Sequence, residues 1–173
     1  SSRYLSMLLE PAIVALGYPL YQQLHAMRSF WKPILFGLTI GAVGAITVSY
    51  LCTLFIINLD QVAVSLALKS ITTPIGLELT EQLKGNSAIT AFAIILAGLF
   101  GAIWGQTWLN FINVKSAKAQ GLAIGAASHA LGTATISQIS YQHAAYSSLS
   151  LIVSAVVTAI FAPSIIETLR VFM

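Results

Sequence analysis

The chain is interrupted at residues 69 to 74 by the stretch Lys69-Ser70-Ile71-Thr72-Thr73-Pro74, which lies within a long apolar segment. A second interruption, Ser128-His129-Ala130-Leu131-Gly132-Thr133, lies in a later apolar segment. Both combine hydroxyl side chains with a residue that disfavours regular helix, Pro74 or Gly132. Lipid cannot hydrogen-bond an unwound backbone, so such breaks persist at membrane depth only where they line a cavity or pack within protein. Two breaks in one small membrane protein therefore predict a solute or ion site where they meet.

The composition indicates a membrane-embedded chain. Of its 173 residues, 57% are hydrophobic and 8% are charged, whereas soluble domains carry about 25% charged residues. Such a chain has too few polar side chains to cover a water-facing surface. Its net charge of +3 comes from only eight Lys and Arg residues, which form no basic cluster. This distribution argues against nucleic-acid binding.

Three uncharged segments, 33–57, 88–112 and 144–166, are long enough to cross a bilayer, which takes about 20 apolar residues. In the first two segments, small residues recur at spacings of three and four. They are Gly37, Gly41, Ala42, Gly44, Ala45, Gly98, Gly101, Ala102 and Gly105. We expect these residues to let helix backbones approach closely. The alternative is ordinary lipid-facing helix with incidental glycine.

Three other segments are apolar but interrupted. Segment 8–22 contains Pro11 and Pro19, segment 61–83 is broken at 70–74, and segment 119–142 is broken at 128–133. We therefore predict an all-α integral membrane protein in which spanning helices alternate with broken or re-entrant helices. Re-entry would place Arg3, Arg28, Lys32, Lys115 and Lys118 on one side and Lys84 and Arg170 on the other. This split obeys the positive-inside rule better than full crossing, which gives three cations against four.

The layout repeats along the chain. A shift of 58 residues carries Ser70 onto Ser128 and Pro74 onto Gly132. Pseudo-repeats 61–113 and 119–171 would each be a broken helix followed by a spanning helix, and re-entry would make them inverted copies. We predict one membrane domain over 1–173. Because the chain begins at Ser1 without an initiator Met, we also expect that N-terminal transmembrane segments are missing from it.

The first break has the chemistry of an anion site. Ser70, Thr72 and Thr73 supply hydroxyls, and a helix restarting at Pro74 would direct free N–H groups and a positive dipole end towards the break. A carboxylate suits such a helix start. Lys69 adds a charge that costs about 2.5–3.5 kcal/mol at the bilayer centre, so we expect it to face substrate, ion or water. The alternatives are snorkelling to the interface and a structural pair with Glu78.

The second break offers similar groups. Ser128 and Thr133 provide hydroxyls, and Gly132 permits unusual backbone angles. His129 is the residue here whose charge changes near neutral pH. It is therefore a candidate for substrate binding and proton coupling, with a satisfied packing histidine as the alternative.

Polar residues outside the breaks are weaker candidates. We expect Gln106 and Asn110 to form interhelical hydrogen bonds, and His25 and His143 to lie solvated in linkers. Glu10 fits the interfacial start of a helix, with a proton or cation site as the alternative.

The sequence does not indicate an enzyme. Five acidic residues are scattered, and the chain has no Gly-rich phosphate loop, HExxH motif or metal-spaced His/Cys cluster. The single cysteine, Cys52, allows neither an internal disulfide nor a cysteine metal site. We expect no catalytic residue, cofactor or metal.

Three stretches resemble motifs of the LrgB/CidB family of bacterial membrane proteins. They read LEPAIVALGYPLY at 9–21, KSITTPI at 69–75, and GLAIG at 121–125 followed by ASHALGTA at 127–134. Thr135 stands where many family members carry Arg. The resemblance implies a multi-pass protein of the bacterial inner membrane that works with a small LrgA/CidA-type partner. Family members are described either as holin- or antiholin-like regulators of murein hydrolase activity and autolysis, or as carriers of small carboxylates, as in the plastid glycolate/glycerate translocator.

The residues themselves favour transport of a small hydroxy- or keto-monocarboxylate, and the resemblance implies one similar to glycolate, glycerate or pyruvate. The predicted substrate-binding residues are Lys69, Ser70, Thr72, Thr73, Ser128, His129, Gly132 and Thr133. The main alternative is a holin/antiholin-like regulator of murein hydrolase activity and autolysis. A membrane scaffold for the LrgA-like partner is a third possibility.

Overall fold

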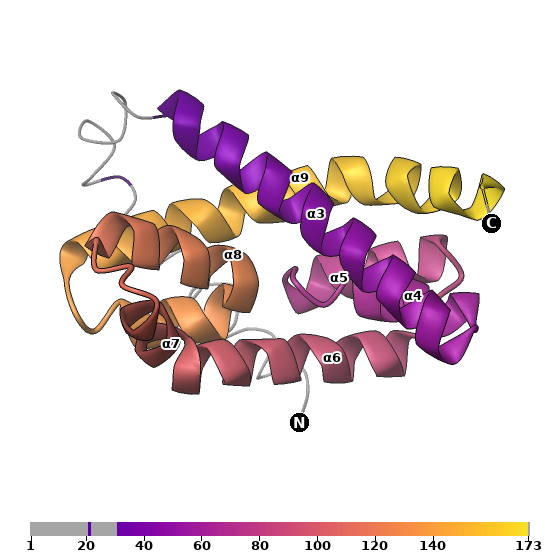
Figure 1. Ribbon diagram of the computed structural model, residues 1–173, viewed down its shortest axis with the longest axis horizontal. Coiled ribbons are helices and arrows are strands. Elements are labelled where there is room, and N and C mark those ends of the chain that lie inside the picture. Colours follow the sequence, from indigo (N-terminus) through magenta and orange to yellow (C-terminus); the bar gives the residue numbers. More distant parts are fainter. Residues whose placement is uncertain (1–20, 22–30, 173) are drawn as a thin grey trace.

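The computed structural model describes Tyr21 and residues 31 to 172, and all of its long elements are helices (Figure 1). In chain order they are α3 (Trp31–Ile57), α4 (Asp60–Ala67), α5 (Thr73–Gln82), α6 (Ser87–Phe100), the π-helix η1 (Gly101–Gly105), α7 (Gln106–Phe111), α8 (Ala117–Ile136) and α9 (Tyr141–Val171). The interrupted segment 8–22, with Glu10, and also Arg3, His25 and Arg28 lie outside the described residues.

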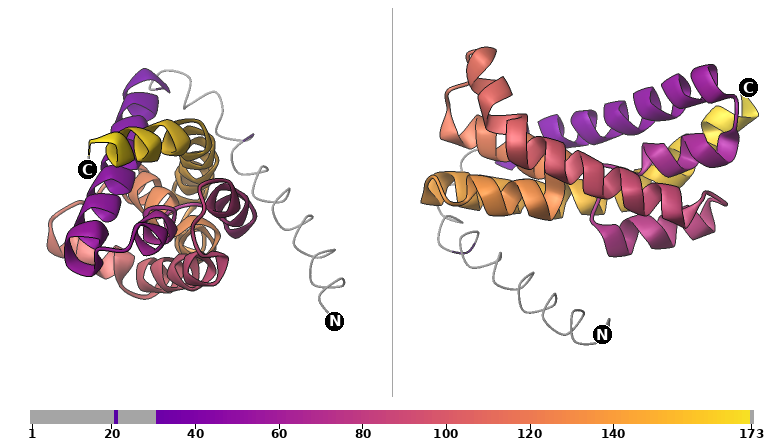
Figure 2. Two further views of the ribbon diagram at one scale, coloured as in Figure 1. Left: turned by 90° about the vertical axis from the view of Figure 1, so that its right-hand side faces the viewer. Right: turned by 90° about the horizontal axis from the view of Figure 1, so that it is seen from below.

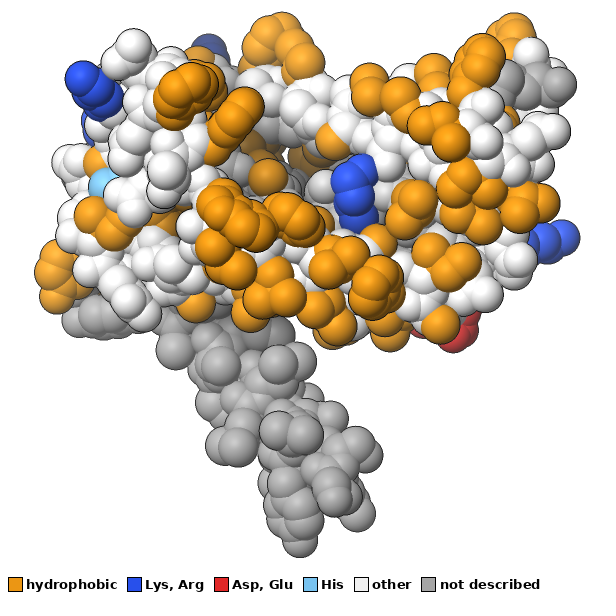
Figure 3. All heavy atoms as spheres, turned by 60° about the horizontal axis from the view of Figure 1, so that its bottom comes forward, with side chains coloured by type: hydrophobic (Ala, Val, Ile, Leu, Met, Phe, Trp, Pro, Cys, Tyr) orange, Lys and Arg blue, Asp and Glu red, His pale blue; other side chains and the backbone are white. Residues whose placement is uncertain are grey.

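Three helical stretches are long and apolar enough to cross a membrane. They are Trp31–Ile57, Ser87–Phe111 and Tyr141–Val171, which confirms the three predicted spans. Large apolar side chains remain exposed along them, including Phe36, Phe55 and Phe92. Figure 3 shows such side chains covering much of one face of the molecule, with few charges among them. This surface is that of a membrane protein, whose outer side chains face acyl chains.

The long helices frame the interrupted ones. Figures 1 and 2 show α3, α6 and α9 extending along the length of the molecule, with α4, α5 and α8 held between them. The main core, contributed by α3, α4, α5, α6, α9 and the turn between α4 and α5, includes Tyr50, Val64, Ile94 and Ile166. In chain order, the separate helices α4 and α5 precede α6, and α8 precedes α9; that these form two pseudo-repeats stays a prediction. The inverted relation between the two units, and the re-entry of the broken helices, stay predictions.

Helix ends are fixed by local chemistry. Asn86 caps α6, because its side-chain Oδ1 accepts hydrogen bonds from the N–H groups of Ala88 and Ile89 at 3.0 and 3.2 Å. At the other ends, Asn58, Lys84 and Asn113 adopt φ values of 53°, 60° and 62° just after α3, α5 and α7. A left-handed residue at this position stops the helical ladder.

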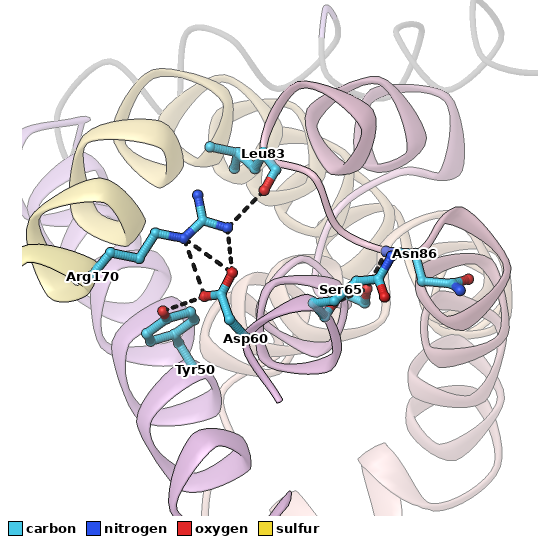
Figure 4. A network of polar contacts seen from close by, with 7 residues as sticks. Tyr50, Asp60, Ser65, Leu83, Asn86 and Arg170 are labelled. Carbon is cyan, nitrogen blue, oxygen red and sulfur yellow. Dashed lines mark hydrogen bonds and ion pairs between the residues drawn. The ribbon is translucent and has the colours of Figure 1, made fainter. Parts of the chain in front are cut away.

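Buried hydroxyls join α4, α5 and α6. Thr80 Oγ1 and Thr90 Oγ1 lie 2.8 Å apart, and Thr80 also donates to the carbonyl oxygen of Gly76. Ser65 Oγ accepts a hydrogen bond from the Asn86 N–H at 2.7 Å (Figure 4). Because both halves of the first broken helix share these contacts with α6, its interruption is held in a defined geometry.

Candidate functional site

The first break separates two distinct helices. The helix α4 ends at Ala67, and α5 begins at Thr73 after an extended Thr72 with φ −66° and ψ 142°. Pro74 lies in the first turn of α5, where its missing N–H is not needed. Within the break, Leu68 and Ile71 are buried. The predicted interruption is thus confirmed, and its backbone is packed in protein as its position among apolar segments requires.

The second break is a single residue. His129 has φ 38° and ψ −130° inside α8, and helix continues on both sides of it. The expectation of an unwound stretch over 128–133 is therefore wrong. Gly132 is also helical, and none of the glycines in the described residues has positive φ. It serves packing instead, because a Cβ at Gly132 would lie 2.5 Å from Ser128 Cβ and 2.8 Å from Ile124 Cγ2.

The two breaks touch. The Nε2 of His129 lies 3.0 Å from the carbonyl oxygen of Lys69. A carbonyl oxygen only accepts, so Nε2 carries the hydrogen and donates it. The break after α4 leaves this carbonyl without the continuous helical ladder that would otherwise satisfy it, and the buried His129 supplies the partner. The prediction that the two interruptions face each other is confirmed.

The side chain of Lys69 turns to α3. Its Nζ donates to Ser49 Oγ at 2.6 Å and approaches the carbonyl oxygen of Leu66 at 3.5 Å. Glu78, the partner considered for it, instead accepts a hydrogen bond from Gln82. Across residues 31–172, the one ion pair joins Arg170 to Asp60. Lys69 therefore holds its amine among neutral oxygens.

A cavity of about 240 Å³ lies beside the break contact. Its wall comes from α3, α4, the first break, α8 and α9. The lining residues are Gly41, Ala42, Ala45, Ile46, Ala67, Ser70, Ala126, Ala127, Ser154 and Thr158. Of the predicted site residues, only Ser70 lines it.

The other predicted residues lie around this cavity in different ways. Lys69 and His129 form the contact described above, and Ser128 packs so tightly on the π-helix that a Cβ at Gly101 would overlap its Oγ. Thr133 is buried with an unpartnered hydroxyl, and Thr72 and Thr73 flank the start of α5. The set predicted as one site is therefore split between the break contact, the packing under it and one residue of the cavity.

Sequence reasoning missed Ser154 and Thr158 of α9, because they lie in an uninterrupted apolar segment that gave no local signal. It also misassigned the small residues of α3. A Cβ placed on Gly37, Gly41 or Gly44 would meet no atom within 4 Å, so these positions leave open space rather than close packing within this chain. The glycines of the second span pack as expected, since Gly98 and Gly105 lie against Leu131 and Ile124.

His143 is not solvated as predicted. It is buried, with Nε2 3.0 Å from Gln120 Oε1 and Nδ1 2.9 Å from Ser140 Oγ. Gln120 in turn donates to Asn110 Oδ1 at 2.7 Å, which confirms the interhelical role predicted for Asn110. This chain of hydrogen bonds fixes the α7–α8 connection against the start of α9.

A polar network closes the end of the molecule where α9 finishes (Figure 4). Arg170 donates to both carboxylate oxygens of Asp60, at 2.6 to 3.2 Å, and to the carbonyl oxygen of Leu83 at 2.8 Å. Tyr50 donates to the same carboxylate at 2.6 Å. The hydrogen bonds from Arg170 hold the pKa of Asp60 below its usual value of 3.8, against the opposing effect of burial. This network ties α9 to both ends of the first broken helix.

The LrgB-like family matches residues 1–168 of the chain. The protein belongs to the LrgB-like family. It is 36% identical to an uncharacterized protein of Haemophilus influenzae over 166 residues, which cover 96% of this chain and 72% of that protein. It is 35% identical to the uncharacterized protein YxaC of Bacillus subtilis, covering 95% and 71%, and 34% identical to the antiholin-like protein LrgB of Bacillus mycoides, covering 93% and 70%. No solved structure matches the chain.

Proposed function

We propose that this protein is an antiholin-like protein of the inner membrane, which restrains murein hydrolase activity and autolysis. The observation that carries the proposal is its family membership over residues 1–168, together with relatives named antiholin-like protein LrgB at 33–34% identity. This function, expected above as the alternative, has better support than transport. In this role the protein acts on the membrane with a small LrgA/CidA-type partner and performs no catalysis.

The test is complementation. The protein is expressed in a bacterium that lacks its own LrgB-type protein, with and without the LrgA/CidA-type partner. Autolysis in detergent and zymographic murein hydrolase activity should both fall when the pair is present. Unchanged autolysis at confirmed membrane expression of both proteins would refute the proposal.

A second candidate, carriage of a small monocarboxylate, is supported by one specific feature, the cavity beside the contact between Lys69 and His129. Its volume of about 240 Å³ lies below the range of about 300–1,000 Å³ typical of drug-sized ligands, which suits a compact solute. Lys69 provides a cation without a carboxylate partner in the described part of the chain. In this function His129 would couple protons, and the break hydroxyls would bind substrate.

Uptake into proteoliposomes tests the carrier. Labelled glycolate or pyruvate should accumulate saturably, with each carboxylate competing with the other. Lys69→Ala and His129→Ala should each lower uptake at least tenfold at equal protein content. Leakage of unrelated solutes at the same rate would instead indicate a holin-like lesion and remove the carrier function.

A further inference from the structure

Ser154 presents a buried hydroxyl that no protein group satisfies. The residue is 4% exposed, and its Oγ has no hydrogen-bond partner. A buried polar group left unpaired costs about 1–3 kcal/mol, so such groups usually have a partner, often water or a ligand. Ser154 lines the cavity between α3 and α9, and a molecule in this cavity can provide that partner.

Two other hydroxyls of α9 have hydrogen-bond partners. Ser150 donates to the carbonyl oxygen of Leu122 at 2.5 Å, and Thr168 donates to the carbonyl oxygen four residues before it. The Thr168 bond to the preceding turn is a common arrangement for a hydroxyl within a helix, and the Ser150 bond reaches α8. Ser154 makes no such bond, although its own helix offers the carbonyl oxygen of Ser150.

The cavity has a polar side and a small-residue side. Thr158 lies one turn after Ser154, and residues four apart share a helix face, so both side chains line the cavity together with Ser70 from the first break. Across from them, Gly41, Ala42 and Ala45 of α3 line it with almost no side chain. The space thus exists because α3 is small at these positions.

The cavity wall carries no charge, and the amine of Lys69 lies outside it. None of the lining residues is charged. The amine of Lys69 is held by Ser49, which lies one helical turn beyond Ala45 on the same face of α3. An anion in the cavity would therefore meet three hydroxyl side chains and no carboxylate in the wall, with the amine of Lys69 held just outside the lining.

We propose that this cavity is the binding site for a small hydroxy- or keto-monocarboxylate, with Ser154 as a hydrogen-bonding contact and Ala42 and Ala45 as the residues that limit its size. The proposal rests on the carrier function above and moves the site from the break residues to the α3–α9 wall. The carboxylate lies towards Lys69, and the hydroxyl or keto oxygen lies against Ser154 and Thr158. Longer acids are excluded by the α3 wall.

Cysteine labelling tests this site without relying on transport. Cys52 is the only cysteine of the chain, so Cys52→Ala provides a background free of thiols. Ser154→Cys in this background is compared with Ser148→Cys, a matched control. Ser148 lies on the same helix and is also buried with an unpartnered hydroxyl, but it does not line the cavity. The probe is a small anionic methanethiosulfonate, applied to protein in proteoliposomes.

We expect the Ser154→Cys variant to react at least tenfold faster than the Ser148→Cys variant, and glycolate to slow its reaction at least threefold. Glycolamide, which has the same shape without the charge, should give no protection. Adding Ala45→Leu should fill the cavity and remove both the fast labelling and the protection, whereas Val48→Leu, at an exposed position of α3, should change neither. Size-exclusion profiles check that each variant is folded.

The outcomes separate this site from the carrier function. Equal labelling of the two cysteine variants, or equal protection by glycolamide, would overturn the site even if wild-type uptake is saturable. Protection by glycolate without any uptake would keep the site and reject the carrier.

Discussion

The two breaks interrupt regular helix in opposite ways. The first stops one helix and starts another, with Pro74 in the first turn of α5 and the turn residues packed in the core. The second keeps one helix and bends it at His129 alone. A local sequence signal suffices for the first break, while the second depends on contacts from outside its own helix. The following changes test this difference.

The largest expected effect comes from the packing that holds the second break. A Cβ at Gly125 of α8 would lie 2.2 Å from the carbonyl oxygen of Ser147, which is backbone of α9 and cannot move aside. Overfilling a packed interior typically costs 1–3 kcal/mol, so we expect Gly125→Ala to cost about 3 kcal/mol or to prevent folding. The readout is the thermal melting temperature of the protein purified in detergent.

Gly76 of α5 is the matched position beside the first break. A Cβ there would approach Ile94 Cδ1 at 2.7 Å and Ile71 Cγ2 at 3.0 Å. These are ends of side chains that can shift, so Gly76→Ala should lower the melting temperature much less than Gly125→Ala. Equal losses at the two positions would contradict the view that only the second break depends on close backbone approach.

The sequence predicted the first break well because its cause is local. Proline is favoured in the first turn of a helix and disfavoured in its interior, and the hydroxyls around Pro74 mark the same place. The bend at His129 has no such cause, since neither Ser128 nor Ala130 breaks helices and Gly132 remains helical. The cavity could not be predicted for a related reason. Ser154 and Gly41 are far apart in the chain, and their meeting follows from how α9 crosses α3.

Position 129 offers a sharper test of the second break. A side chain at φ 38° and ψ −130° lies outside the regions that L-residues favour, and such strain costs of the order of 1–3 kcal/mol. His129→Ala loses the hydrogen bond to Lys69 and keeps the strain, whereas His129→Gly loses the bond and relieves it. We therefore expect the Gly variant to be more stable than the Ala variant by about 1 kcal/mol.

This order of stability, with Gly above Ala, is the reverse of that in an ordinary helix interior, where Ala is more stable than Gly by about 1 kcal/mol. Ala130→Gly, one residue along in regular helix, is the control and should show the usual loss. Both comparisons use urea or thermal unfolding of the same purified protein. An Ala variant at 129 that equals or exceeds the Gly variant would mean that α8 is regular helix at this point and that the breaks do not meet as described.

The smallest expected effect concerns the first broken helix, which Arg170 ties to α9 through Asp60 and the carbonyl oxygen of Leu83 (Figure 4). Because the Asp60 side chain is 45% exposed, solvent screens the pair, and we expect Asp60→Asn to cost at most about 1 kcal/mol. The folded-state pKa of Asp60 is lowered from 3.8, so its contribution is present above pH 3.8 and is lost as the pH falls through the lower folded value. Asp60→Asn should therefore lower the melting temperature near pH 7 and flatten its decline below pH 4.

Glu167→Gln is the control. It removes a carboxylate at the same end of α9, and this carboxylate forms no ion pair within residues 31–172. The variant should change neither the melting temperature near pH 7 nor its decline in acid. A full acid decline in the Asp60→Asn variant would place the sensitivity elsewhere and would mean that the pair with Arg170 does not stabilise the first broken helix.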